Sequence, residues 1–434
     1  MGRTEERPAD GVPADGRPAG RGRVLVVTND FPPRTGGIES FVLAVASRLP
    51  ADEVVVHTAR QVGDAEHDAL LAFPVVRDRA RLLVPTPAVV RRVAATARAH
   101  GCDRVWFGAA APLALMAPAL RRAGARRVVA TTHGHETWWS TLPLARSALR
   151  AIGERVDVLT ALGPWCAGRI ARPLAPRGRA RLQRLVPGVD AAVFRPGAGG
   201  GAVRRELGLE GRPVVVCVSR LVARKGQDVL VRAMPAVLAQ VPDAVLLVVG
   251  DGPARRRVER LVRRLGVGAS VVLTGRVPWE RTAEHYAAGD VFAMPTRTRL
   301  LGLEPEALGI CYLEAAATGL PVVGGDSGGA PDAVRPGRTG VVVDGRDPAA
   351  VARAVVGLLR DPERARAWGA EGRRWVAAAW SWEGQVDRLR VLLDPSTPVP
   401  PGPDPALDLP ARRPGRPRWL RPPRARHLAD DAPG

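Results

Sequence analysis

Short apolar runs alternate with segments of helical periodicity along most of the chain. Residues 24–27 are an uninterrupted apolar run that ends in polar residues 28–30, the pattern of a parallel strand buried on both faces. After a loop rich in proline and glycine, apolar residues recur at intervals of three and one from Ile38 to Leu49, which predicts an amphipathic helix. Further strands are predicted at 54–56, 104–107, 128–131 and 158–160.

A second series of the same kind begins near Pro213. Strands are predicted at 214–218, 244–249, 270–273, 291–294, 321–323 and 340–343, and helices at 228–240, 254–265, 280–288, 312–318 and 348–359. Two successive series of this type predict an α/β protein with two doubly wound, Rossmann-like domains that face each other. The Pro/Gly-rich residues 194–201 suit a hinge, so we place the first domain at 23–195 and the second at 196–375.

The two ends differ in composition from this body. Residues 1–22 and 394–434 are rich in Pro, Gly, Arg and Asp and lack apolar periodicity, so we predict disordered tails. A basic run at 412–426 includes Trp419 and Leu420 and can be read as a lipid contact or as a solvated tail.

Composition limits the class of protein. With 46% hydrophobic and 25% charged residues in 434, wholesale disorder is excluded. The apolar stretch 105–120 is too short for a membrane span, and residues 1–22 lack the apolar core of a signal peptide. The four cysteines are far apart and form no CxxC pair, which predicts a reducing, cytoplasmic location with no disulfide and no zinc site.

The net charge of +21 lies almost entirely in the body. Residues 1–22 contribute no net charge and residues 394–434 contribute +2, so 23–393 carries +19, of which +12 lies in 23–195. A basic body favours a polyanionic partner such as nucleic acid, an anionic membrane or a phosphorylated substrate. The alternative is compositional drift, because Lys225 is the only lysine among 64 basic residues.

Two segments could hold phosphate groups. Gly36 and Gly37 precede the first helix, where backbone N–H groups at a helix start attract anions, although a tight turn is the alternative. Arg220 and Lys225 follow the first strand of the second domain, and two cations at a strand end can clamp a diphosphate. A solvated loop is the alternative there. No GxGxxG or P-loop motif follows any predicted strand.

Two carboxylates, Glu306 and Glu314, are separated by eight residues in an apolar segment. On a helix this spacing is on the order of 12 Å, which suits the two ends of an extended ligand better than an acid/base pair. A sugar joined to a nucleotide through a diphosphate has that shape. An unpaired carboxylate on the apolar face at Glu314 would be costly, and ligand hydroxyls would offset that cost.

His133 closes a predicted strand of the first domain within the segment TTHGHE. The pattern is not HExxH and no third ligand cluster is evident, so a metal site is disfavoured. Strand ends line the crevice of open α/β sheets, which favours a substrate contact by His133.

These motifs together resemble a known enzyme family. The segments RLVARKG (220–226), GDGP (250–253), the E-x7-E block (306–314), the TG-PVV-GG-P series (318–331) and VPGVD (186–190) resemble the retaining GT-B glycosyltransferases of family 4 over 23–393. Within that family, residues 29–41, 77–87, 131–136 and 297–310 look most like bacterial phosphatidylinositol monomannoside α-mannosyltransferases. Those enzymes use GDP-mannose and a lipid acceptor.

The resemblance implies a role for each matching position. Arg220 and Lys225 would hold the donor diphosphate, Glu306 the hydroxyls of the transferred sugar, and Glu314 the ribose. His133 would contact the sugar near its reacting carbon. Backbone contacts to the donor would come from Gly36, Gly37, Gly250, Leu308, Gly309 and Ile310.

The resemblance also implies an architecture and a mechanism. It implies the GT-B fold with a deep cleft between the domains, and a C-terminal helix at 376–393 that returns to the first domain. It implies front-face retention with no metal and no other cofactor. Two positions depart from the family pattern: Ala307 stands where glycine is usual, and Asp332 where glutamate is frequent.

The acceptor side is predicted from a basic and apolar stripe. Leu82–Val84 and Val89–Val90 are flanked by five arginines, which favours an anionic lipid surface, although an ordinary packed helix gives the same pattern. The flanking residues are Arg77, Arg79, Arg81, Arg91 and Arg92.

The sequence thus predicts a cytoplasmic enzyme, peripherally bound to the inner face of the plasma membrane. It would move mannose from GDP-mannose to a phosphatidylinositol mannoside. One alternative is a family 4 enzyme that uses a UDP-sugar or a soluble acceptor. The other is a noncatalytic nucleic-acid binder, which the 4% aromatic content and the lack of a binding motif disfavour, so no nucleic-acid partner is predicted.

Overall fold

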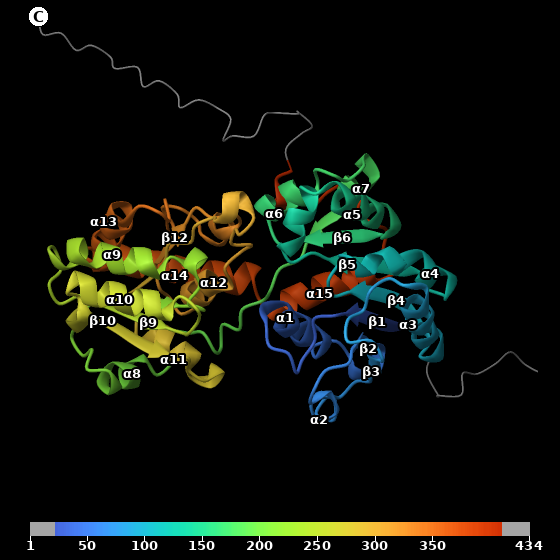
Figure 1. Cartoon of the computed structure of the whole chain (residues 1–434), viewed down its shortest axis with the longest axis horizontal. Helices are drawn as coiled ribbons and strands as arrows, with labels where there is room; N and C mark the ends of the chain where they lie inside the picture. Colours follow the sequence, from blue (N-terminus) through green and yellow to red (C-terminus); the bar gives the residue numbers. More distant parts are fainter. Residues whose placement is uncertain (1–21, 410–434) are drawn as a thin grey trace, which may run out of the picture.

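Parallel strands, most of them buried, form two sheets in the computed structural model, which describes residues 22–409 (Figure 1). The first sheet has seven strands in the order β3-β2-β1-β4-β5-β6-β7, and every pairing is parallel. Its strands are β1 (Arg23–Thr28), β2 (Val54–Ala59), β3 (Val75–Asp78), β4 (Cys102–Phe107), β5 (Arg127–Thr131), β6 (Val158–Ala161) and β7 (Leu182–Arg184).

Alternation along β1 shows why its four central residues, 24–27, are all apolar. Val24 and Val26 belong to the apolar cluster on one face of the sheet, while Leu25 and Val27 belong to the cluster on the other face. Side chains that alternate between two buried faces leave no position for a polar residue. The helices of this domain are α1 (Gly37–Ala46), α2 (Asp64–Asp68), α3 (Pro87–Ala99), α4 (Ala117–Arg122), α5 (Pro143–Arg155), α6 (Pro164–Ile170) and α7 (Pro176–Ala180).

The second sheet has six strands in the order β10-β9-β8-β11-β12-β13, again all parallel. Its strands are β8 (Val214–Val218), β9 (Val245–Val249), β10 (Val271–Gly275), β11 (Val291–Met294), β12 (Val322–Gly325) and β13 (Gly340–Val343). Its helices are α8 (Gly200–Glu206), α9 (Gln227–Leu238), α10 (Arg255–Leu265), α11 (Thr282–Ala287), α12 (Ile310–Ala317), α13 (Pro348–Leu359) and α14 (Pro362–Ala379). The predicted fold class, two Rossmann-like α/β domains, is confirmed.

The last helix, α15 (Trp382–Leu393), lies with the first domain although it follows the second in sequence. It contacts α1, β4 and β5, and in Figure 1 its red ribbon lies beside the blue α1. Val386 and Leu389 are buried in the same apolar cluster as Phe41 of α1. This helix therefore links the end of the second domain to the first sheet.

Two edge strands and one terminal segment differ from the sequence-based expectation. The edge strand β3 carries Arg77 and Asp78, and β7 has three residues, so neither presents an apolar run. Residues 394–409 were expected in a tail, but Leu407 is fully buried and the carboxylate of Asp404 accepts a hydrogen bond from the Arg184 N–H. The rest of both predicted tails, including 412–426, lies outside the described residues. Within 22–409, no helix has the length and apolar character needed to cross a bilayer.

The strand orders show where a ligand would bind. In the first sheet β1 lies between β2 and β4, and in the second β8 lies between β9 and β11. Loops that leave such neighbouring strands run in opposite directions and open a crevice at the carboxyl ends. The loops after β8 and β11 contain Lys225 and Glu306, respectively.

Candidate active site

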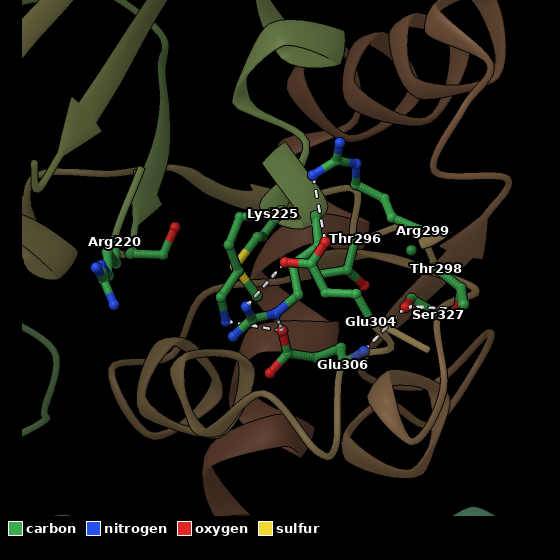
Figure 2. A network of polar contacts seen from close by, with 12 residues as sticks. Arg220, Lys225, Thr296, Thr298, Arg299, Glu304, Glu306 and Ser327 are labelled. Carbon is green, nitrogen blue, oxygen red and sulfur yellow. Dashed lines mark hydrogen bonds and ion pairs between the residues drawn. The ribbon is translucent and has the colours of Figure 1, made fainter. Parts of the chain in front are cut away.

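An ion pair between Lys225 and Glu306 lies at the carboxyl edge of the second sheet (Figure 2). Lys225 Nζ is 3.0 Å from Glu306 Oε2, and the two side chains are 11% and 9% exposed. Burial opposes ionisation of Glu306, but Lys225 and Arg224 outweigh burial and hold the pKa of Glu306 below its ordinary value. The site therefore contains a fixed ammonium beside a fixed carboxylate.

Arg220 provides a second cation at the same edge. Gln227 anchors its turn by donating hydrogen bonds to Ser219 Oγ (2.8 Å) and to the Arg220 carbonyl (3.2 Å). The Arg220 side chain is exposed and has no ion-pair partner within the described part of the chain, and in Figure 2 no dashed line reaches it. Its backbone is fixed while its guanidinium remains open to an anion, as a diphosphate clamp requires.

Arg224 and Glu304 belong to the same network, and the sequence analysis did not identify either. Arg224 Nε lies 3.4 Å from Glu306 Oε2, and Arg224 Nη1 lies 3.6 Å from Glu304 Oε1. Glu304 Oε2 is also 3.2 Å from Arg299 Nη1, a contact visible in Figure 2. Two sequence features could have pointed to this network: the adjacent cations Arg224-Lys225 and the alternating acids of Glu304-Pro305-Glu306. Acids that alternate near paired cations favour a network of ion pairs.

Glu314 lies within α12 and has a protein partner. Tyr286, which is buried in α11, donates a hydrogen bond from its hydroxyl to Glu314 Oε2 at 2.7 Å. Burial raises the pKa of Glu314, although the Tyr286 hydrogen bond and the charge of Lys225 oppose that rise. The Tyr286 contact joins α11 to α12, and no local sequence pattern predicts it.

Glycines bring the backbone close to this site. Gly250 has φ 129°, and a Cβ there would lie 2.3 Å from the Ser219 carbonyl oxygen. Gly309 precedes α12 with φ 79°, and a Cβ there would lie 2.6 Å from the Tyr312 ring. Only glycine fits both conformation and space at these positions. Leu308, Gly309 and Ile310 lead into the first turn of α12, whose amides lack intrahelical acceptors.

The first domain contributes His133, which follows β5. His133 Nε2 is 2.6 Å from the Gly108 carbonyl oxygen, and since a carbonyl only accepts, Nε2 carries the proton. Burial lowers the pKa of His133 to about 4, so the imidazole is neutral near pH 7. Its ring contacts Phe41 edge to face at 5.1 Å. Nδ1 remains available as an acceptor.

The two domains touch at the loops that hold these groups. A Cβ on Gly134 would lie 2.5 Å from the Ala307 Cβ, so the loop after His133 meets the loop after Glu306. Cys166 Sγ donates to the Ala307 carbonyl at 3.4 Å, and the Trp165 N–H donates to Asp332 Oδ2 at 3.2 Å. Both residues that depart from the family pattern, Ala307 and Asp332, are thus contacts between domains.

Gly36 and Gly37 lie apart from these contacts. Gly36 caps the start of α1, both residues are exposed, and a Cβ on Gly37 would meet no atom within 4 Å. No described contact joins them to the second domain. The open space at Gly37 leaves room for an anion at the helix start. Among residues 22–409, no group of three or more His, Cys, Asp or Glu side chains is arranged to hold a metal ion.

The basic stripe predicted for lipid contact is only partly accessible. Arg77 pairs with Asp68 at 2.7 Å, and Arg92 binds both oxygens of Asp78, so these two arginines hold loops and helices together. Leu83 is buried. The exposed members of the stripe are Leu82 (59%), Val84 (44%), Arg79, Arg81 and Arg91.

Comparison with known proteins identifies the family of the chain. Residues 202–375 match the family model for glycosyl transferases group 1, and residues 35–193 match that for glycosyltransferase family 4. The chain is 49% identical over 375 residues to a GDP-mannose-dependent alpha-(1-6)-phosphatidylinositol monomannoside mannosyltransferase of Mycolicibacterium smegmatis, covering 85% of this chain and 98% of the relative. It is 44% identical to the enzyme for the monoacylated acceptor in Corynebacterium glutamicum, covering 86% and 97%.

Solved structures share the fold. Anabaena HepE in complex with UDP superposes with a TM-score of 0.71 at 18% identity, covering 85% of this chain and 98% of that one. WaaG, a glycosyltransferase of lipopolysaccharide biosynthesis, has a TM-score of 0.60 at 20% identity, covering 85% and 99%.

Proposed function

The chain belongs to the family 4 glycosyltransferases, and on that premise we propose that it transfers an α-mannosyl residue from GDP-mannose to a phosphatidylinositol mannoside. Relatives at 44–49% identity over most of both chains have this donor and acceptor in their names, which supports both assignments. The observation that carries the proposal is the buried ion pair of Lys225 with Glu306 at the carboxyl edge of the second sheet, with the exposed Arg220 in the same loop as Lys225.

The charges of this edge suit the departure of GDP. When the bond between mannose and the diphosphate breaks, negative charge grows on the leaving phosphate. Lys225 is held in place by Glu306, and Arg220 has no competing carboxylate, so both cations meet that charge with little reorganisation. The start of α12 adds backbone N–H groups. We therefore expect no metal ion in the reaction.

We propose that the transfer retains the configuration at the reacting carbon of the sugar. Glu306, the carboxylate that the family resemblance assigns to the transferred sugar, is engaged by ion pairs with Lys225 and Arg224. We propose that the acceptor hydroxyl attacks from the face the phosphate leaves, and that a phosphate oxygen takes the hydroxyl proton. The bond to GDP breaks, the bond to the acceptor oxygen forms, and GDP leaves with that proton.

The neutral imidazole of His133 fits a binding role in this reaction. Nε2–H is engaged by Gly108, so it does not deliver a proton to the leaving group. Nδ1 can accept a hydrogen bond from a sugar hydroxyl. His133 thus orients the sugar from the first domain while the second domain holds the nucleotide.

A lipid acceptor requires contact with a membrane surface, and we propose that the first domain provides it. Exposed apolar side chains lie just after the His133 loop, at Trp138 (41%), Leu142 (53%) and Leu144 (88%). Exposed Arg146 and Arg150 follow on α5. Tryptophan and leucine beside arginine suit the interface of an anionic leaflet, which supports peripheral binding at the inner face of the plasma membrane.

The test is transfer from labelled GDP-mannose to phosphatidylinositol monomannoside in vesicles by the purified full chain. A mannosylated lipid with an α linkage by NMR is expected. Competition by GDP and UDP in calorimetry then separates the donor from a UDP-sugar. No lipid product together with no GDP binding would contradict the proposal, while product from a soluble acceptor alone would reassign the acceptor.

A further inference from the structure

A groove of about 680 Å³ lies beside residues 297–300, between α9, α10 and the start of α13. None of its lining residues is among those assigned above to the donor. Five arginines and a single carboxylate, Asp228, line it. The arginines are Arg232, Arg257, Arg297, Arg299 and Arg346. We propose that this arginine groove binds the phosphate groups of an anionic ligand at a site separate from the donor site.

The charge of the groove is only partly neutralised by the protein. Asp228 accepts from Arg297 at 2.8 and 3.0 Å and lies 3.3 Å from Arg257 Nη2. Arg346 donates to the carbonyl of Thr298, which is uncharged. Arg232 is exposed and has no hydrogen bond or ion pair to any described residue. Guanidinium groups repel one another at short range, and an anion between them would relieve that repulsion.

The shape of the groove and the chemistry of its lining favour a phosphate ligand over a carboxylate ligand that carries a single charge. Planar guanidinium groups bind phosphate oxygens in pairs, and several of them around one groove suit a ligand with more than one negative charge. A second hollow shares Arg232 and Arg257 and continues along α10 past Arg260 and Arg264. The basic surface is therefore larger than a single phosphate group would need.

The groove is connected to the donor loop by ion pairs. Arg299 pairs with Glu304 at 3.2 Å, and Glu304 lies 3.6 Å from Arg224, which in turn contacts Glu306. A phosphate that binds Arg297 and Arg299 would therefore order the loop that leads to Glu306. Leu300 lines the same groove and is 63% exposed, so a lipid headgroup and a soluble polyphosphate both present the required chemistry.

The experiment titrates inorganic pyrophosphate into the full chain after GDP has been added in excess to fill the donor site. Calorimetry should show a further binding event. In the double variant Arg232→Ala/Arg346→Ala its affinity should fall at least tenfold. The matched control Arg256→Ala/Arg263→Ala removes the same charge from exposed positions of α10 outside the groove and should change the affinity less than twofold.

A second readout follows the loop itself. Pyrophosphate should slow amide hydrogen exchange across residues 297–304 in the wild type and in the control, but not in the groove variant. Absence of pyrophosphate binding to the GDP-filled protein, or equal losses in the two double variants, would overturn the proposal. GDP binding is measured first in the same sample, so failure of the donor assignment is seen separately.

Vesicles distinguish the two sources of phosphate. If the groove variant alone loses binding to phosphatidylglycerol vesicles, relative to phosphatidylcholine vesicles, the ligand is a lipid headgroup. If it loses pyrophosphate binding but keeps vesicle binding, the ligand is a soluble phosphorylated compound. Equal loss of binding to vesicles or to random DNA in both double variants, without a groove-specific effect on pyrophosphate, would indicate diffuse charge and contradict the site.

Discussion

Ala307 occupies the space that a side chain at Gly134 would need, since a Cβ at residue 134 would lie 2.5 Å from the Ala307 Cβ. Gly134 also has φ 91°, which L-residues rarely adopt. The pair joins the His133 loop of the first domain to the Glu306 loop of the second. The methyl group of Ala307 therefore sets how closely the two loops approach.

We expect Gly134→Ala to hold the domains apart and to lower kcat/KM at least tenfold, because the new methyl group meets Ala307. Ala307→Gly alone should change the rate by less than threefold. The double variant should recover part of the loss, but not all, because the backbone strain at residue 134 remains. A double-mutant cycle on initial rates measures this, and a double variant no faster than Gly134→Ala would show that the contact does not matter.

Lys225→Ala should reduce turnover by about 10² or more, because it removes a fixed cation from the leaving diphosphate. It also leaves Glu306 buried with only the longer Arg224 contact, so we expect a loss of stability of about 3 kcal/mol. Arg220→Ala should give a similar loss of turnover with an unchanged melting temperature, since Arg220 is exposed and unpaired. Initial rates and calorimetric melts separate the two, and near-normal rates in both variants would mean that the donor lies elsewhere.

We expect the two carboxylates, Glu306 and Glu314, to have different roles. Glu306→Gln should impair transfer more than GDP binding, because Glu306 holds Lys225 in place and, in the proposed function, binds hydroxyls of the sugar. Glu314→Gln should weaken GDP binding. Tyr286→Phe removes the hydrogen bond that holds the Glu314 carboxylate, so it should also lower the affinity for GDP, by a smaller factor. Titration calorimetry with GDP alongside steady-state rates tests this assignment, and the opposite pattern would exchange the two roles.

Particular elements show how much of the structure could be predicted from the sequence. Strands β8 and β11 agree residue for residue with the prediction, because burial on both faces leaves an unbroken apolar run. The bounds of β13 also agree, although its three valines are only half-buried at the edge of the sheet. Edge strand β3 could not be found, since its ion pairs interrupt that pattern. Lys225 and Glu306 stood out as charges beside buried strands, whereas the contact of Gly134 with Ala307 depends on the placement of two domains, which no local pattern encodes.

The depressed pKa of His133 predicts how stability depends on pH. Burial lowers this pKa to about 4 from an ordinary value near 6.5, so the unfolded chain binds a proton at His133 between these values and the folded chain does not. The folded protein therefore loses stability as the pH falls from 6.5 toward 4. Above pH 6.5, His133 is neutral in both states and its titration does not affect stability. His133→Gln should keep more of its pH 7 stability at pH 4.5 than the wild type does, in urea unfolding. An equal acid loss in both proteins would exclude His133 as the titrating group.

Asp332 makes the second contact between the domains, and its short side chain fits the space beside Gly163 and Trp165. Its Oδ2 accepts from the Trp165 N–H, and a Cβ on Gly163 would lie only 2.6 Å from the same oxygen. Burial raises the pKa of Asp332, and the Trp165 hydrogen bond opposes that rise. A glutamate at this position, with one more methylene, would push its carboxylate into the start of α6.

We therefore expect Asp332→Glu to separate the domains more than Asp332→Asn, which keeps both the length of the side chain and an acceptor oxygen for the Trp165 N–H. Small-angle scattering should show a larger radius of gyration for Asp332→Glu, and its KM for the donor should rise several-fold while Asp332→Asn stays within twofold of the wild type. The reverse order, with Asp332→Asn as the more open variant, would mean that the charge of Asp332, and not the length of its side chain, holds the domains together. In that case raising the pH should tighten donor binding, because ionisation of Asp332 strengthens the hydrogen bond that Trp165 donates.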